Sequence, residues 1–244
     1  MSNPRIFWAG DSTVTQNDYR TYPQSGIGQG IRLYIKKEIE IKNHAVNGRS
    51  TKSFIDESRL APIYDEITKG DFLFIQFGHN DEKIQDPSHY TDPDGEFCVN
   101  LGKYATAARN KGAHPVFITP LYRRNFQEDG SLYQGEHLAY RKAVIRTAGE
   151  RNVPCIDLCT ASRKLIEKTP AEVSEHWFMN LAKGEFENFP DGKQDNTHLQ
   201  WSGAMTFGNL LAAGLKALGG IYEELLIEPE KLTVSFEGEV FHEK

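Results

Sequence analysis

The stretch RIFWAGDSTV, residues 5–14, decides how the rest of the chain is organised. An apolar, aromatic run that stops at Gly-Asp-Ser predicts a buried strand ending in a tight turn. Such a turn lifts the hydroxyl of Ser12 clear of the sheet edge, where a catalytic nucleophile belongs. Asp and Ser after a strand also cap a following helix in many proteins, so these residues alone leave both interpretations open.

The composition is that of an ordinary soluble globular protein, with 39% hydrophobic and 25% charged residues among 244. We expect a single α/β domain over residues 1–244. A net charge of -6 without a dense basic stripe argues against a nucleic-acid partner, and the composition argues against a membrane-spanning chain. The first strand follows the start of the sequence with no leader pattern before it, so we expect a cytoplasmic protein.

No cofactor or metal is expected from the sequence. The cysteines are odd in number, offer no disulfide framework and have no zinc-like spacing with histidine: Cys98, Cys155 and Cys159. Gly26, Gly28 and Gly30 lie too far beyond the first strand for a dinucleotide-binding fingerprint. We interpret these glycines as packing or loop residues.

Strands and helices alternate along the chain, which predicts a parallel five-stranded sheet with helices on both faces. The four further strands are expected at 38–46, 71–77, 114–119 and 153–158. Helices are expected at 26–35, within 51–69, at 96–111, 136–152 and 158–168, and from about 201 to 218. Residues 170–194 look irregular, with at most one short helix. The tail from 221 to 244 alternates over 232–236 and is a candidate edge-strand extension.

Polar motifs follow three of these strands and precede the last helix. Ser12 follows the first strand, Gly48 the second and Asn80 the third, and a turn with Asp195 and His198 comes before the last helix. Because ligands bind at the carboxyl ends of parallel strands, one rim of the fold should gather all of these residues.

A serine hydroxyl is a weak nucleophile near neutral pH and needs a base that is itself oriented by a third group. A carboxylate three positions before a histidine in a turn can bond Nδ1 and leave Nε2 facing Ser12. Asp195 and His198 fit these roles, and Asp191 in the same loop is the alternative carboxylate. The same pattern also fits a helix cap beside a surface histidine.

Attack on an ester carbonyl also requires donors for the developing oxyanion. We assign the backbone N–H groups of Ser12 and Gly48 and the side-chain amide of Asn80. Glycine suits this role because the backbone can approach a ligand closely. A plain turn glycine and an Asx-turn asparagine are the alternatives for Gly48 and Asn80.

These blocks together resemble those of the SGNH, or GDSL-type, hydrolases: Gly-Asp-Ser-Thr-Val at 10–14, Asn-Gly-Arg-Ser around Gly48, Gly-His-Asn-Asp at 78–81, and Asp195-x-x-His198. The Thr13 form of the first block, with His79 in the third, is similar to the rhamnogalacturonan acetylesterase branch. The resemblance implies a three-layer, flavodoxin-like fold and removal of acetyl groups from pectin-derived oligosaccharides. The tail after residue 221 has no counterpart in the pattern.

Three further side chains are candidates for substrate contact. For His79 the alternatives are a contact with substrate and a structural hydrogen bond within its loop. For Trp177 and Trp201 the alternatives are stacking on sugar rings and packing in the core. We therefore expect a cofactor-free serine esterase whose partner is an acetylated oligosaccharide. The alternatives are an SGNH esterase, lipase or thioesterase for another acyl ester, and a catalytically silent carbohydrate-binding relative. The sequence carries no signal for the oligomeric state.

Overall fold

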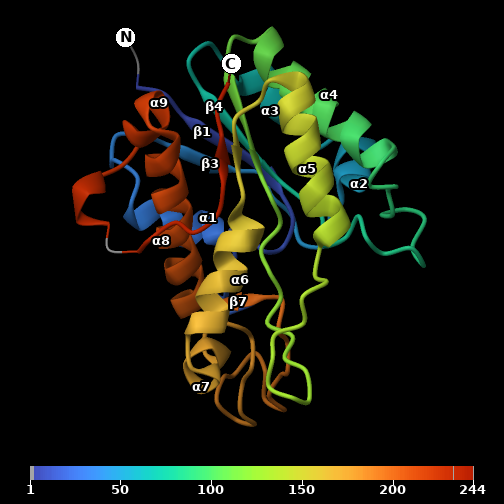
Figure 1. Ribbon diagram of the computed structural model, residues 1–244, viewed down its shortest axis with the longest axis vertical. Coiled ribbons are helices and arrows are strands. Elements are labelled where there is room, and N and C mark those ends of the chain that lie inside the picture. Colours follow the sequence, from blue (N-terminus) through green and yellow to red (C-terminus); the bar gives the residue numbers. More distant parts are fainter. Residues whose placement is uncertain (1–2, 233, 244) are drawn as a thin grey trace.

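The computed structural model describes residues 3–232 and 234–243 and has a central sheet with helices on both faces (Figure 1). The strand order is β3-β1-β4-β5-β6-β8. Five strands are parallel, and β8 pairs antiparallel with β6. Their bounds are β1 Ile6–Gly10, β3 Ile41–Asn43, β4 Phe72–Gln76, β5 His114–Ile118, β6 Cys155–Ile156 and β8 Val240–Phe241. The predicted α/β class is confirmed.

Two hydrophobic clusters, one on each face of the sheet, hold the three layers together. Successive strand residues point to opposite faces, so Trp8 belongs to one cluster while its neighbour Phe7 belongs to the other. The first cluster is covered by α1 Ile27–Gly30, η1 Ile31–Leu33, α6 Leu158–Lys168 and α8 Trp201–Leu218. The second is covered by α2 Thr51–Asp56, α3 Leu60–Glu66, α4 Glu96–Asn110 and α5 Leu138–Arg151.

Several short elements complete the fold. α7 Ala171–Glu175 lies in the segment expected to be irregular, and its end precedes Trp177. α9 Gly220–Glu223 and η2 Pro229–Lys231 follow α8. A separate ladder, absent from the sequence prediction, pairs β2 Gln24–Ser25 with β7 Leu199–Gln200. No helix among the described residues has the length and apolar character needed to cross a membrane.

Some predicted boundaries were wrong for identifiable reasons. The helix expected within 51–69 is divided in two because Ser58, between α2 and α3, adopts a positive φ of 57°. The edge strand expected over 232–236 is not formed at its described residues, and Thr233 lies outside the described part. Leu232, Val234 and Phe236 alternate because they pack on the first cluster, while the tail pairs with the sheet further on, at β8.

The glycines of α1 allow this short helix to approach its neighbours closely. A Cβ on Gly30 would lie 1.8 Å from the carbonyl oxygen of Ala204 in α8, and one on Gly28 would lie 2.3 Å from Asn43 Nδ2. A Cβ on Gly26 would lie 2.3 Å from the carbonyl oxygen of Thr15. All three are therefore packing glycines, and they hold α1 against α8 and the loop after Ser12.

We predict that Gly30→Ala lowers the free energy of unfolding by roughly 1–3 kcal/mol, because the added methyl group must push α1 away from α8. The matched control is Gly149→Ala in α5, where a Cβ meets open space. This control should raise the free energy of unfolding by about 0.5–1 kcal/mol. Urea denaturation of both variants checks the prediction, and equal effects of the two substitutions would contradict it.

Candidate active site

Ser12 lies in the turn that follows β1, as the sequence predicts, and its side chain is almost buried. The preceding carboxylate fixes the turn: Asp11 Oδ1 accepts hydrogen bonds from the Thr13 N–H at 2.9 Å and from Thr13 Oγ1 at 2.8 Å. Burial raises the pKa of Asp11, while Thr13 and the nearby charges of His137 and His198 act in the opposite direction. The chain at His198 runs close to this turn, because Leu199 pairs with Ser25 in the β2–β7 ladder and the Ile27 N–H donates to the Thr13 carbonyl at 2.8 Å.

Asp195 and His198 form the pair that the sequence predicts. His198 Nδ1 lies 2.7 Å from Asp195 Oδ2, and the other carboxylate oxygen accepts the His198 backbone N–H at 3.0 Å. Lys193 Nζ also lies 2.9 Å from Asp195 Oδ2. Asp191 is exposed, so Asp195 is the carboxylate that orients the ring. Within the described residues, no hydrogen bond joins the Ser12 hydroxyl to His198.

The surroundings of Asp195 keep its carboxylate charged. Partial burial acts to raise the pKa of Asp195, but the hydrogen bonds from the His198 ring and backbone, with the help of Lys193, hold it well below its usual range. A carboxylate that stays ionised stabilises a positively charged imidazole beside it. The pair is therefore suited to a histidine that takes up a proton during a reaction.

The three donors assigned to an oxyanion lie in the segments that follow β1, β3 and β4. Gly48 has a φ of +80°, the left-handed conformation that favours glycine, and a Cβ there would meet open space. Among the described residues, the backbone N–H groups of Ser12 and Gly48 have no intramolecular acceptor. Asn80 Nδ2 donates to the Arg49 carbonyl at 3.0 Å, which places the third block beside the second and leaves one amide hydrogen available.

Lys83 fixes the orientation of this asparagine. Its Nζ donates to Asn80 Oδ1 at 2.7 Å, so the amide nitrogen must face the opposite way. A charged donor on the amide oxygen also polarises the group, which strengthens its remaining N–H as a donor. The plain Asx-turn considered for Asn80 does not describe these contacts.

His79 lies inside the protein, with only 4% of its surface exposed. Its ring packs on that of His137, with 4.1 Å between the ring centroids. Burial, together with the charges of His137 and Arg123, holds the pKa of His79 well below its usual range. Neither ring nitrogen of His79 has a hydrogen-bond partner among the described residues, so the bond expected within its loop is not formed, and the ring is held by packing against His137.

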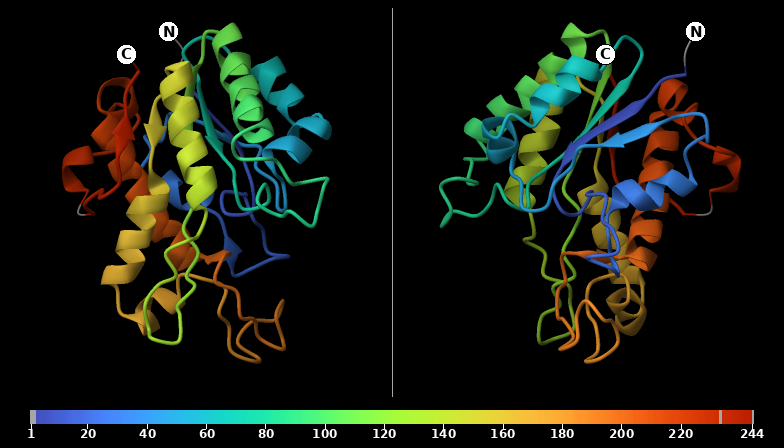
Figure 2. Two further views of the ribbon diagram at one scale, coloured as in Figure 1. Left: turned by 45° about the vertical axis from the view of Figure 1, so that its right-hand side comes forward. Right: turned by 180° about the vertical axis from the view of Figure 1, so that it is seen from behind.

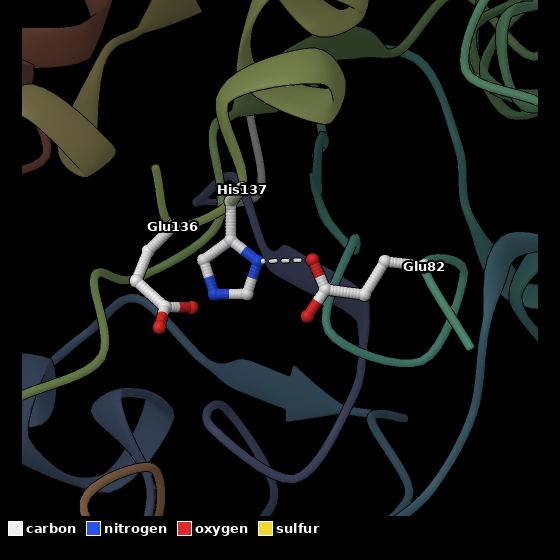
Figure 3. Close-up of side chains that lie close together, drawn as sticks. All are labelled: Glu82, Glu136 and His137. Carbon is white, nitrogen blue, oxygen red and sulfur yellow. Dashed lines mark hydrogen bonds and ion pairs between the residues drawn. The ribbon is translucent and has the colours of Figure 1, made fainter. Parts of the chain in front are cut away.

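His137 belongs to a polar cluster that packs against the Gly-His-Asn-Asp segment, residues 78–81. Figure 3 shows its ring between the carboxyl groups of Glu82 and Glu136, with Nδ1 at 2.9 Å from Glu82 Oε2. One ligand atom from each of these three residues lies within 4.8 Å of the others, a spacing that a metal ion can use. The Arg123 guanidinium contacts both carboxylates, however, so it already supplies the compensating positive charge.

The two candidate tryptophans differ in their surroundings. Trp177 packs edge-on against Phe207 of α8, with ring centroids 5.6 Å apart, and contributes to the first hydrophobic cluster. Trp201, at the start of α8, is 41% exposed and borders a cavity of about 250 Å³ with Gln16. Core packing therefore accounts for Trp177, whereas Trp201 keeps an exposed surface.

Sequence reasoning missed Arg124, which clamps the turn containing Asp195. Its backbone N–H donates to the Asn196 carbonyl at 2.9 Å, and its guanidinium donates to Asn196 Oδ1, Ser174 Oγ and the Ala171 carbonyl. Asn180 completes the clamp by accepting the Asp195 N–H at 2.9 Å. No short motif contains these partners, because they are separated by 47 to 72 positions from Arg124.

We predict that Arg124→Met accelerates backbone hydrogen exchange in the peptide that contains 195–198 by about tenfold, because the turn loses several hydrogen bonds. Arg124→Lys should give an intermediate rate, since an ammonium group cannot reach all three acceptors. The control is Arg163→Met, on α6, whose guanidinium bonds to Gln134 and Glu167. Unchanged exchange in Arg124→Met, measured by mass spectrometry, would show that the clamp does not hold the turn.

Asp81 connects the third block to the start of α2. Its buried carboxyl accepts hydrogen bonds from the Thr51 N–H at 3.0 Å and from Thr91 Oγ1 at 2.8 Å. Burial raises the pKa of Asp81 to about 7, against the opposing effect of these donors. In the unfolded chain the pKa of this carboxyl is about 4, so the proton is released at a pH where the folded protein still holds it.

This difference makes stability depend on pH with a defined sign. Above about pH 4, the Asp81 carboxyl is ionised in the unfolded chain but protonated in the folded one. The free energy of unfolding should therefore fall by up to about 1.4 kcal/mol per pH unit, until the folded acid ionises at about pH 7. Asp81→Asn should lack this component. The measurement compares urea denaturation of both proteins at several pH values, and parallel pH profiles would refute the assignment to Asp81.

Comparison with known proteins identifies close relatives. The chain is 40% identical over 233 residues to rhamnogalacturonan acetylesterase RhgT of Bacillus subtilis, covering 94% of this chain and 97% of that protein. It is 36% identical over 228 residues to the probable rhamnogalacturonan acetylesterase YesY of the same organism, covering 93% of this chain and 99% of that protein.

Solved structures share the fold. The structure of YxiM from Bacillus subtilis matches 88% of this chain and 56% of its own, with 25% identity and a TM-score of 0.74. The acetylxylan esterase Axe2 from Geobacillus stearothermophilus matches 87% of this chain and 94% of its own, with 16% identity and a TM-score of 0.59. The model of the GDSL-like lipase/acylhydrolase family matches residues 9–204. The chain therefore belongs to the GDSL-like lipase/acylhydrolase family of ester hydrolases.

Proposed function

We propose that this protein is a serine esterase that removes O-acetyl groups from pectin-derived, rhamnogalacturonan-type oligosaccharides. The observation that carries the proposal is the Asp195–His198 pair, 2.7 Å apart, near a serine turn with unpaired N–H donors around it. The substrate class is supported by two Bacillus subtilis relatives, one named as a rhamnogalacturonan acetylesterase and the other as a probable one.

The first half-reaction transfers the acetyl group to the enzyme. Ser12 Oγ attacks the acetyl carbonyl carbon while His198 Nε2 takes the hydroxyl proton, and Asp195 stabilises the resulting imidazolium. Hydrogen bonds between a nucleophile and its base often form or shorten only when substrate is bound. The lack of a hydrogen bond between the Ser12 hydroxyl and His198 is therefore compatible with these roles. The Ser12 and Gly48 N–H groups and the Asn80 amide hold the negative oxygen.

Collapse of this intermediate breaks the bond between the carbonyl carbon and the sugar oxygen. His198 returns its proton to that oxygen, so the deacetylated sugar leaves and Ser12 retains the acetyl group. Water then attacks the acetyl-serine with His198 again as the base, which releases acetate and restores the hydroxyl. Every proton in the cycle is carried by His198, and no external cofactor enters the balance.

We predict that Ser12→Ala and His198→Ala each lower kcat by on the order of 10⁶, because nucleophile and base act as one unit. Asn80→Ala should lower kcat by roughly 10²–10³ with little change in KM, since its amide is used chiefly in the transition state. Acetate release from acetylated rhamnogalacturonan oligosaccharides is the measurement. Ser235→Ala, at an exposed position of the tail, is the matched control and should behave as the wild type.

Three results would overturn this proposal, each in a different way. Substantial turnover by a folded Ser12→Ala protein would exclude Ser12 as the nucleophile. Faster hydrolysis of long-chain acyl esters or thioesters than of acetylated sugars would instead retain the mechanism and replace the substrate class. Sugar binding without any acetate release would indicate a silent carbohydrate-binding relative.

A further inference from the structure

Two loops rise from the candidate catalytic residues, and each is closed at its base. The first, residues 15–26, begins after the Ser12 turn and returns to it, since the Ile27 N–H donates to the Thr13 carbonyl at 2.8 Å. The second, residues 180–194, leads into Asp195 and is closed by reciprocal hydrogen bonds between Leu181 and Lys193. We call them the serine loop and the aspartate loop. Figure 2 shows both loops toward the end of the sheet opposite the chain termini.

The outer parts of these loops are joined to each other. Asn188 Nδ2, in the aspartate loop, donates to the carbonyl oxygens of Tyr19 and Tyr22 in the serine loop, at 2.8 and 2.9 Å. The Phe186 ring packs edge-on against that of Tyr22, with 5.7 Å between the centroids. Segments more than 160 positions apart in sequence thus form one wall beside the candidate site.

The base of the serine loop is also fixed, by a side chain of α1. Gln29 Oε1 accepts the Asn17 N–H at 3.0 Å, and Gln29 Nε2 donates to the Asn17 carbonyl at 3.1 Å. With hydrogen bonds at its base and at its outer part, the loop presents its side chains in a defined arrangement. Exposed aromatic residues on such a fixed loop are a typical feature of binding sites.

The two tyrosines of the serine loop are exposed to a degree that packing does not explain. Tyr19 is 82% exposed and Tyr22 is 58% exposed, although their backbone carbonyls are engaged by Asn188. Each ring offers a flat apolar face and a phenolic hydroxyl at its edge. Pyranose rings have the complementary form, with an apolar C–H face surrounded by hydroxyl groups, and they stack on such surfaces.

We propose that Tyr19 and Tyr22 form a stacking platform for the sugar residues that flank the acetylated one. This inference rests on the proposed function and assigns the chain-binding part of the same site. An acyl chain would require a concave apolar channel, whereas these rings project into solvent from the wall. The occupant is therefore the carbohydrate side of the ester, and binding energy from distant sugar residues holds the acetyl group at Ser12.

The test measures binding without turnover, in the Ser12→Ala background. Isothermal titration calorimetry with acetylated rhamnogalacturonan oligosaccharides should give a dissociation constant about tenfold higher after Tyr19→Ala and Tyr22→Ala are added together. Tyr64→Ala is the matched control, because Tyr64 is an exposed tyrosine of α3 on the second face of the sheet. Its dissociation constant should equal that of the parent protein.

A kinetic measurement gives a second, independent readout. In the otherwise wild-type enzyme, the tyrosine double variant should lose about tenfold in the ratio of kcat/KM for the acetylated oligosaccharide to kcat/KM for p-nitrophenyl acetate. An unchanged dissociation constant with an unchanged ratio, or no measurable oligosaccharide binding to the Ser12→Ala parent, overturns the platform. Failure of the proposed function is distinct: the wild type would then release no acetate from an oligosaccharide that it binds.

Discussion

The pairing of β1 with β4 is the constraint on which the candidate site depends. Gly10, the last residue of β1, pairs with Gln76, the last residue of β4, so the blocks that follow emerge at the same edge. A Cβ on Gly10 would lie 2.9 Å from the Gln76 carbonyl oxygen, which is why the first block requires glycine before Asp11. The positions of Ser12 and Asn80 are thus consequences of strand register.

Polar contacts between distant segments then turn this edge into a site with fixed charges. Arg124 and Asn180 hold the turn with Asp195 from one side, and Lys193 adds positive charge at the carboxylate that meets His198. In the low dielectric of a partly buried turn, such contacts determine which groups remain ionised. The same aspartate loop contacts Tyr19 and Tyr22 at its outer part, so one segment supports both the Asp195–His198 pair and the proposed sugar platform.

The sequence was informative where function depends on local pattern and was not where it depends on contacts between loops. Strand positions, and the proximity of Asp195 to His198, follow from apolar runs and from a spacing of three residues. The clamp by Arg124 and the junction at Asn188 could not be predicted, because their partners share no period or motif. The tail was misassigned at 232–236 because burial on one side produces the same alternation as a half-buried strand.

The central claim is that Ser12 is the nucleophile and that His198 activates it. Peptide mapping by mass spectrometry after treatment with a fluorophosphonate tests this most directly, since the reagent forms a stable adduct with an activated serine. We predict an adduct on the peptide that contains Ser12, activity lost in proportion to labelling, and much slower labelling in His198→Ala. An adduct on another residue, or full ester hydrolysis by protein completely labelled at Ser12, would contradict the account.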